Sequence, residues 1–212
     1  GYKIEETIYT YYGNGKNKSK GTWENGKRNG LFTYWDESGV KIKEGTYVND
    51  LMEDKWYFSF VNKLTKKKES LTGSFRSGNE GELNKNSGVP RNGRHGLFTG
   101  FYLNGQKKSE GTYKDGKIHG LKTEWYENGQ KKSETTYKDG KEDGLSTQWY
   151  ENGQKRYERN YKEGGKDGLW SEWYRNGNIK EEVRYGGGYK IEETIYTYYG
   201  NGKNKSKGTW EN

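Results

Sequence analysis

Few side chains of this sequence are of the types and spacings that bind metals or transfer protons. The two histidines, His95 and His119, occupy one position of a repeated turn that also holds Asn29, Asp143 and Asp167. Equivalent positions in successive hairpins lie about 9.6 Å apart, whereas two ligands of one metal ion both lie about 2 Å from it. The pattern favours a turn position over a metal site, and we expect no cofactor.

The remaining polar motifs lack the partners that a reaction needs. The glycine-rich segment 163–166 resembles a phosphate loop, but no helix is expected after it. Glu124 and Glu172 share one strand position, which Gln148 holds in the copy between them, so an acid–base pair of carboxyls is poorly supported. No nucleophile and base with an orienting third group is evident. We therefore expect a protein that is not an enzyme.

The charged residues favour a solvated surface. The chain has 38 basic and 30 acidic residues, closely interspersed, and a net charge of +8. Lysine runs at 16–20 and 66–68 could touch phosphate, but they also suit an exposed strand edge, where lysine discourages uncontrolled pairing. A nucleic-acid surface combines aromatic rings with unbroken positive charge, and no run of about 20 apolar residues exists for a membrane helix. Neither nucleic acid nor membrane is the expected partner.

The composition indicates strands and tight turns. The 212 residues include 33 Gly, no Ala and no Cys, and the apolar residues are mostly aromatic, with 20 Tyr, 8 Trp and 6 Phe. The best helix formers are scarce, whereas Tyr, Trp and Thr favour strands and Gly favours turns. Disulfides are excluded. The chain is therefore expected to be all-β.

A repeat with a period of 24 organises the chain, and segments 111–134 and 135–158 agree at 17 of 24 positions. Each copy reads as two strands, one turn with Asp-Gly and one with Asn-Gly, which are strong hairpin signals. We predict an elongated antiparallel meander of about seven to eight hairpins, a repeat ribbon or solenoid, forming a single array over 1–212. Its units are a partial copy at 1–20, then 21–44, a degenerate copy at 45–72, a copy with an insertion of about 14 residues at 73–110, and 111–134, 135–158, 159–182 and 183–207.

The repeat resembles a known family. The pattern YENGQKKSEGTYKDGKxHGLxTEWY is similar to the bacterial variant of the MORN repeat, a group that includes the YwqK antitoxin-like proteins. The resemblance is clearest over 91–182, good at 21–44 and weaker elsewhere. It implies an elongated, twisted antiparallel sheet of successive hairpins that acts as an interaction scaffold. It implies little about activity, since fold does not determine function.

Side chains of a strand alternate between the two faces of a sheet. Leu121, Thr123 and Trp125 are therefore expected on one face, and Lys122 and Glu124 on the other. The interpretation favoured for the aromatic residues is core packing, with glycines leaving room for neighbouring rings. We expect tryptophans and tyrosines of successive copies to interleave in one structural aromatic column, made of Trp125, Trp149, Trp173, Tyr113, Tyr137 and Tyr161.

A second aromatic residue follows the tryptophan in each copy. Adjacent strand residues point to opposite faces, so Tyr126, Tyr150 and Tyr174 are expected to form a second column. We hypothesise that this column covers the other side of the ribbon by coiling, by a partner chain or by stacking on a ligand such as a glycan. The alternative is that these tyrosines merely shield the backbone. The turns themselves are assigned to Gly116, Gly129, Gly140, Gly153 and Gly177.

The chain also contains an identical duplication. Residues 188–212 repeat residues 1–25 at every position, whereas the best pair of shorter copies differs at 7 positions of 24. This defines a longer repeat with a period of 187, the superrepeat, which comprises about seven hairpins or about 67 Å before any coiling. We interpret the sequence as a window of a continuous array, in one long chain or in subunits joined end to end by strand pairing. An engineered duplication is the alternative.

We therefore expect a structural repeat protein that forms a bacterial filament by continuous hairpin stacking, with itself as the partner. The first alternative is a module that binds glycan or cell wall through exposed aromatic columns. The second is an antitoxin-like or membrane-associated scaffold. The expected location is extracellular or on the cell surface, with the cytoplasm as the alternative.

Overall fold

The computed structural model describes residues 4–199 and 202–211, which form 16 strands and no helix. The chain divides into two compact units, Gly1–Lys117 and Ile118–Asn212. Since the described residues contain no helix, none is available that could span a membrane. The predicted fold class, an all-β antiparallel meander of hairpins, is confirmed.

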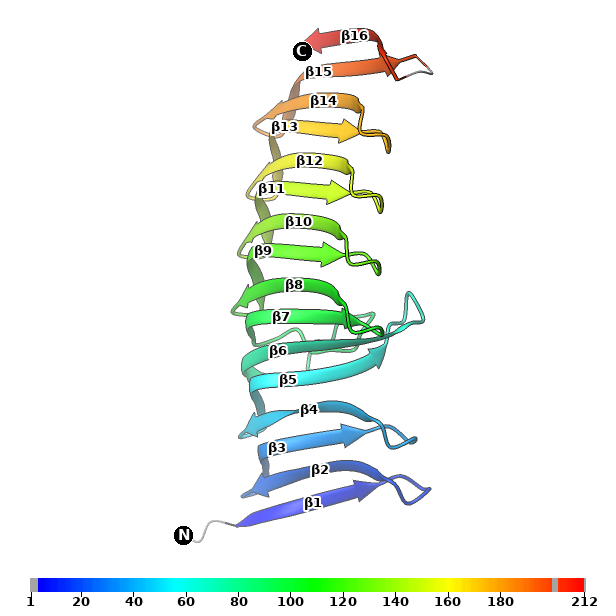
Figure 1. Ribbon diagram of the computed structural model, residues 1–212. Coiled ribbons are helices and arrows are strands. Elements are labelled where there is room, and N and C mark those ends of the chain that lie inside the picture. Colours follow the sequence, from blue (N-terminus) through cyan, green and yellow to red (C-terminus); the bar gives the residue numbers. More distant parts are fainter. Residues whose placement is uncertain (1–3, 200–201, 212) are drawn as a thin grey trace. The chain divides into compact units, whose positions relative to one another are not determined.

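In the first unit, successive strands pair antiparallel in chain order (Figure 1). Residues 79–93 between the sixth and seventh strands form the insertion predicted from the sequence, and we call them the insertion loop. The strands are β1 (Glu5–Tyr11), β2 (Asn17–Glu24), β3 (Lys27–Trp35), β4 (Lys41–Val48), β5 (Leu51–Val61), β6 (Lys68–Gly78), β7 (Arg94–Tyr102) and β8 (Lys107–Lys114).

The second unit repeats the same arrangement without an insertion, and its successive strands again pair antiparallel. The regularity follows from the near-identical length of its copies. The strands are β9 (Lys117–Trp125), β10 (Lys131–Lys138), β11 (Lys141–Trp149), β12 (Lys155–Lys162), β13 (Gly165–Trp173), β14 (Ile179–Gly186), β15 (Tyr189–Tyr198) and β16 (Asn204–Glu211).

The Asp-Gly turns are two-residue hairpin loops with both central residues in the left-handed region. Asp115 and Gly116 have φ of 50° and 77°, and Asp139 and Gly140 have φ of 51° and 88°. These angles define the type I′ turn, whose twist matches that of the flanking strands. A short polar residue followed by glycine meets this requirement at the lowest conformational cost.

The Asn-Gly turns differ from the two-residue hairpin loops that this dipeptide usually indicates. In the loop between β9 and β10, the amide of Gly129 donates to the carbonyl of Tyr126 at 3.0 Å. Only the glycine has a positive φ, 83°, because Asn128 instead uses its side chain to accept from the amide of Gln130 at 3.0 Å. A register shift follows between Lys131 and Ser133.

Each unit has two distinct faces. The face that we call the aromatic face carries Phe32, Tyr47 and Trp56 in the first unit. The opposite face, the threonine face, carries the buried Thr33 and Thr99. In the second unit, the aromatic face carries Tyr161, Trp170 and Tyr185, and the threonine face carries Thr123, Thr147 and Ser171.

The core of the first unit lies on the aromatic face, where rings lie over glycines of neighbouring strands. Phe32 lies directly opposite Gly21 in the β2–β3 ladder, and a Cβ on Gly21 would overlap the Phe32 ring. The same relation joins Gly45 to Trp56. Because the glycine has no side chain, the ring lies close to the neighbouring backbone and its apolar surface leaves water.

We predict that Gly21→Ala destabilises the first unit by about 1–3 kcal/mol, because the added methyl group forces the Phe32 ring out of place. The matched control is Gly208→Ala, at the identical position of the duplicated segment. Its nearest neighbour is the end of the exposed Trp210 side chain, at 2.8 Å, which has room to move. Urea denaturation of the two variants measures the difference. Equal losses would contradict the role given to the ring.

Candidate functional site

The aromatic face of the first unit carries an unbroken run of rings from β2 to β8. Neighbouring ring centres lie between 4.8 and 6.1 Å apart, mostly edge to face, the arrangement that aromatic pairs prefer. Trp56 and Tyr47 are fully buried within it. In order, the run consists of Trp23, Phe32, Tyr47, Trp56, Phe58, Phe75, Phe98 and Tyr113.

The insertion loop covers the middle of this run. Val89 is 1% exposed and belongs to the same apolar cluster as Phe75 and Phe98. The loop is closed on itself by a bridge between Leu83 and Pro90, and it folds back over the sheet behind β6 and β7 (Figure 1). It therefore acts as a partial second layer over the sheet of the first unit.

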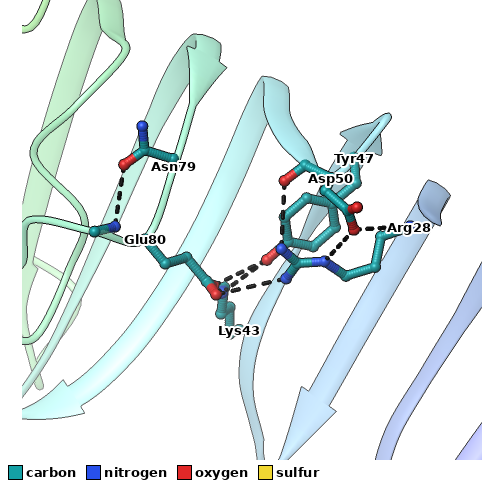
Figure 2. Close-up of polar contacts among 7 residues, drawn as sticks. Arg28, Lys43, Tyr47, Asp50, Asn79 and Glu80 are labelled. Atoms are coloured by element: carbon teal, nitrogen blue, oxygen red, sulfur yellow. Dashed lines mark hydrogen bonds and ion pairs between the residues drawn. The ribbon is translucent and has the colours of Figure 1, made fainter.

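One end of the insertion loop is held by a cluster of charged groups on β3 and β4. Figure 2 shows the Glu80 carboxylate between Arg28, Lys43 and Tyr47. It accepts hydrogen bonds from the Tyr47 hydroxyl at 2.9 Å and from Lys43, and lies 3.5 Å from an Arg28 nitrogen. Asp50 binds the Arg28 Nε at 3.1 Å. We call these five residues the Glu80 clasp.

The clasp perturbs the protonation of its members. Burial disfavours the Glu80 carboxylate, but hydrogen bonds from Lys43 and Tyr47 and nearby positive charge outweigh it and lower the pKa of Glu80. Burial also lowers the pKa of Lys43, partly opposed by its bond to Glu80. The pKa of Tyr47 is raised, mainly by burial, so its hydroxyl remains a hydrogen-bond donor.

The other end of the loop is held by an arginine at an equivalent repeat position. The Nε of Arg94 donates to the Pro90 carbonyl at 2.8 Å. Its guanidinium lies 5.0 Å from the centre of the Phe98 ring and 5.3 Å from that of Tyr113. Arg28 stacks in the same way on Tyr47, at 3.9 Å. One repeat position therefore supplies an arginine to each end of the loop, and Lys43 adds a third cation at the Glu80 end.

A hollow of about 470 Å³ opens on the aromatic face of the first unit beside the clasp. It is lined by the aromatic residues Trp23, Phe32 and Tyr34 and by Thr10 and Ser19, whose hydroxyl groups hydrogen-bond to each other at 2.6 Å. Apolar walls with a few polar groups are typical of small-molecule sites. In the second unit, a smaller hollow of about 240 Å³ is lined by Trp170. The cationic groups of Arg159 and Lys166 lie over that ring, 4.8 and 4.7 Å from its centre, so they occupy the space where a ligand would stack.

The expected interleaving of tryptophans with tyrosines is wrong. Tyr161 lies opposite Gly144, on the face of Ser146, whereas Trp149 lies on the other face. Opposed residues of an antiparallel ladder share a face, and the repeat pattern alone does not specify this register. Tyr113 packs on Phe98 and Tyr161 on Trp170, and Tyr137 lies opposite Gly120. The tyrosines Tyr113, Tyr137 and Tyr161 therefore lie on the aromatic face, and Trp125, Trp149 and Trp173 on the threonine face.

The tryptophans alternate with lysines instead. Lys131 lies opposite Trp125 in the β9–β10 ladder, and its ammonium group is 6.0 Å from the ring centre of Trp149 in the next hairpin. Lys155 lies opposite Trp149 and 5.6 Å from Trp173. Each such lysine also binds a glutamate three residues later, as Lys131 binds Glu134 at 2.6 Å. The Lys-x-x-Glu spacing was the sequence signal for this arrangement, and the register shift places both residues on one face.

The tyrosines of the predicted second column link neighbouring hairpins. The Tyr126 hydroxyl donates to the Trp149 carbonyl at 2.7 Å, and that of Tyr150 donates to the Trp173 carbonyl at 2.9 Å. Tyr174 is 42% exposed, and its ring contacts Tyr198 edge to face at 6.2 Å. Tyr126 and Tyr150 therefore contribute hydrogen bonds between copies, and Tyr174 contributes a ring contact.

The glycines assigned to turns all lie in the left-handed region that favours glycine. Their φ angles fall between 77° and 88°. On one side of the sheet, the turn amide of Gly140 donates to the carbonyl of Ile118 in the preceding hairpin at 2.8 Å. In an Asn-Gly turn, the side-chain amide of Asn152 donates to the carbonyl of Arg175 in the next hairpin at 2.9 Å. Both kinds of turn therefore help to connect successive hairpins. The glycines concerned are Gly116, Gly129, Gly140, Gly153 and Gly177.

The polar motifs considered for catalysis form other contacts. His119 lies 3.3 Å from Asp139, and His95 lies 3.2 Å from an Arg76 nitrogen. Glu124 binds Lys122 at 2.5 Å within its own strand. Among residues 4–199 and 202–211, no group of three or more His, Cys, Asp or Glu side chains is arranged to hold a metal ion.

We predict that acid releases the insertion loop. A carboxyl whose pKa is lowered by folding contributes stability above its unfolded pKa, and this contribution is lost as the pH falls through the folded value. Hydrogen exchange of residues 79–93 should therefore accelerate below about pH 4.5, the ordinary value for Glu. Glu80→Gln should accelerate it about tenfold at neutral pH and remove most of the acid dependence.

The matched control is Glu82→Gln in the same loop. Glu82 pairs with Arg91 at 3.3 Å, but both side chains are more than half exposed, and such pairs contribute little. Its exchange at neutral pH should remain close to that of the unmodified chain. Equal acceleration by the two variants would contradict the clasp.

Comparison with known proteins agrees with this architecture. The family model described as the MORN repeat variant matches residues 28–49, 94–115, 118–139, 142–163 and 166–185, together half of the chain. Each match covers two successive strands and the Asn-Gly or related turn between them, as with β9 and β10. A search of the curated proteins finds no match. The chain belongs to the MORN repeat variant family.

Proposed function

We propose that this protein is a non-enzymatic structural scaffold, a segment of a tandem array that forms a filament by continuous hairpin stacking. The family assignment supports a repeat protein with a structural or binding role. Each hairpin has little core of its own, so stability depends on its neighbours, as in other repeat proteins. An extracellular or cell-surface location, with the chain itself as the main partner, is part of the proposal.

The observation that carries the proposal is the shared register of the duplicated segments. In the β1–β2 hairpin, Glu5 lies opposite Glu24 and Thr7 opposite Thr22. The β15–β16 hairpin, one superrepeat later, reproduces every one of these pairs, including the register shift near its end. The same sequence therefore adopts the same hairpin in both places. The first copy of the hairpin, β1–β2, pairs with β3, which follows it in the chain. The second copy, β15–β16, pairs with β14, which precedes it. The same hairpin is therefore seen with a strand on either side, as a continuous stack requires.

A chain with several copies of residues 1–187 followed by residues 188–212 tests this proposal. Electron microscopy should show rods whose length grows by about 67 Å, less any coiling, for each added copy of seven hairpins. The unmodified chain serves as the length standard. Particles whose length does not increase with copy number would contradict the filament.

The hollow beside the Glu80 clasp favours a second function, binding of a glycan or cell-wall polymer. Its rings can stack on a sugar face while Thr10, Ser19 and Asp50 bond to hydroxyl groups. Such a ligand suits the extracellular location proposed above. The family resemblance suggests a third function, an antitoxin-like or membrane-associated scaffold, and the +8 charge suits an anionic membrane surface. Co-purification with a toxin or binding to anionic vesicles would favour it.

We predict that Trp23→Ala abolishes or weakens glycan binding at least tenfold on a glycan array, since this ring forms part of the wall of the hollow. Trp210→Ala is the matched control, because Trp210 is the same residue of the duplicated segment and is 57% exposed. It should bind like the unmodified chain. Failure of the unmodified chain to bind any glycan, or equal loss in both variants, would exclude this site.

A further inference from the structure

The β15–β16 hairpin is held on β14 by a specific set of contacts. The Tyr196 hydroxyl donates to the Glu182 carboxylate at 2.7 Å, and the rings of Tyr198 and Tyr174 meet edge to face at 6.2 Å. Thr194 lies opposite Glu182 in the ladder and is 5% exposed. Together with the ladder hydrogen bonds, these contacts define what β14 recognises.

The β1–β2 hairpin carries the same recognition elements on an uncovered edge. Thr7, Tyr9 and Tyr11 are the counterparts of the three β15 residues that contact β14. Here they are exposed, with Tyr9 at 44% and Tyr11 at 59%. Within the described part of the chain, β1 pairs with β2 alone, in the register that β15 forms with β16. The edge of β1 is therefore a second copy of the surface that β14 already binds.

The two hairpins differ in what lies behind them. Trp23 of β2 packs on Phe32 of β3 with ring centres 5.9 Å apart. Its counterpart Trp210 in β16 is 57% exposed. A β1–β2 hairpin that docked on β14 would thus bring the packed β3 strand with it, whereas β15–β16 leaves a large aromatic side chain in water.

The geometry points to a docking surface for a second copy of this chain: the β1–β2 hairpin of one copy binds the β14 edge of another in place of the β15–β16 hairpin. The β15–β16 hairpin then acts as a cap that a second copy can displace from β14. This inference rests on the proposed scaffold function and names its partner and its interface. It also requires no new contact, because the two segments are identical at every position.

Concentration decides which hairpin occupies β14. The contacts are the same, and the cap is tethered to its site, with an effective concentration on the order of millimolar. At about 10 μM chain, the cap therefore outcompetes a second copy by roughly 100-fold. The intact chain should remain monomeric, and exchange should appear once the cap is weakened by more than this factor.

Thr194→Pro tests the proposal in the full-length chain. Proline breaks the β15 ladder, because it lacks an amide proton and does not fit a paired strand, while β1 and β14 keep their sequences. Light scattering at about 50 μM should show head-to-tail oligomers. Thr7→Pro, the matched control, should remain monomeric. The double variant, with an open β14 edge but a broken β1, should also remain monomeric.

A disulfide between copies tests the register directly, since the chain has no cysteine of its own. A chain with Thr194→Pro and Glu182→Cys, mixed with a tagged Thr7→Cys chain, should form a crosslinked heterodimer, because the corresponding residues lie opposite each other in the β14–β15 ladder. Ile8→Cys in place of Thr7→Cys should crosslink at least tenfold less, because its side chain points to the other face.

The possible outcomes are distinct. Oligomers of Thr194→Pro that persist in the double variant, or crosslinks that do not distinguish residue 7 from residue 8, would mean nonspecific association and overturn the inference. A Thr194→Pro chain in which hydrogen exchange shows that β15 has left β14, but which stays monomeric and forms no crosslink, would also overturn it. In that case rods of covalently joined copies would still support the filament, so failure of the interface and failure of the scaffold are separable.

Discussion

A ring placed over a glycine of the next strand is the contact on which the fold of the first unit depends. A sheet without a second layer has little apolar surface to bury, and aliphatic residues are scarce here. Phe32 over Gly21 and Trp56 over Gly45 place ring surface against the backbone of the next strand, and the insertion loop covers the middle of the run. In the β10–β11 hairpin, Thr135 holds the position of the glycine and Ser146 that of the ring. Their hydroxyl groups hydrogen-bond to each other at 2.7 Å instead. Each hairpin is thus completed by its neighbour.

The strands and turns could be predicted because they depend on local sequence. Asp-Gly and Asn-Gly with alternating flanks fix hairpin positions, and the repeat period fixes their number. The faces could not be assigned by the same means. Register shifts such as that between Lys131 and Ser133 move later residues to the other face, and they leave no clear mark in composition. The shift places Trp149 opposite Lys155 and on the other face from Tyr161, and the Lys-x-x-Glu spacing was its one trace in the sequence.

The Glu80 clasp was beyond sequence reasoning for a different reason. It joins residues 52 positions apart, from Arg28 to Glu80, and neither belongs to a recognisable motif. Only the folding back of the insertion loop brings them together. The sequence shows that Arg28 and Arg94 occupy the same repeat position. It does not show that the loop places the Glu80 carboxylate beside one guanidinium and the Pro90 carbonyl beside the other. Insertions in repeat proteins therefore carry information that the repeat pattern does not.

The insertion loop also affects how an array would appear to a partner. Hairpins of nearly the same sequence offer the same surface at every step, so a protein that binds one could bind any of them. Residues 79–93 occur once in the superrepeat, and their clasp fixes them on one face of the first unit. An array built from this superrepeat would carry one landmark about every 67 Å. Such a polymer would have two distinguishable ends and one distinct surface in each superrepeat. Accessory proteins that bind this surface would be spaced at regular intervals along it.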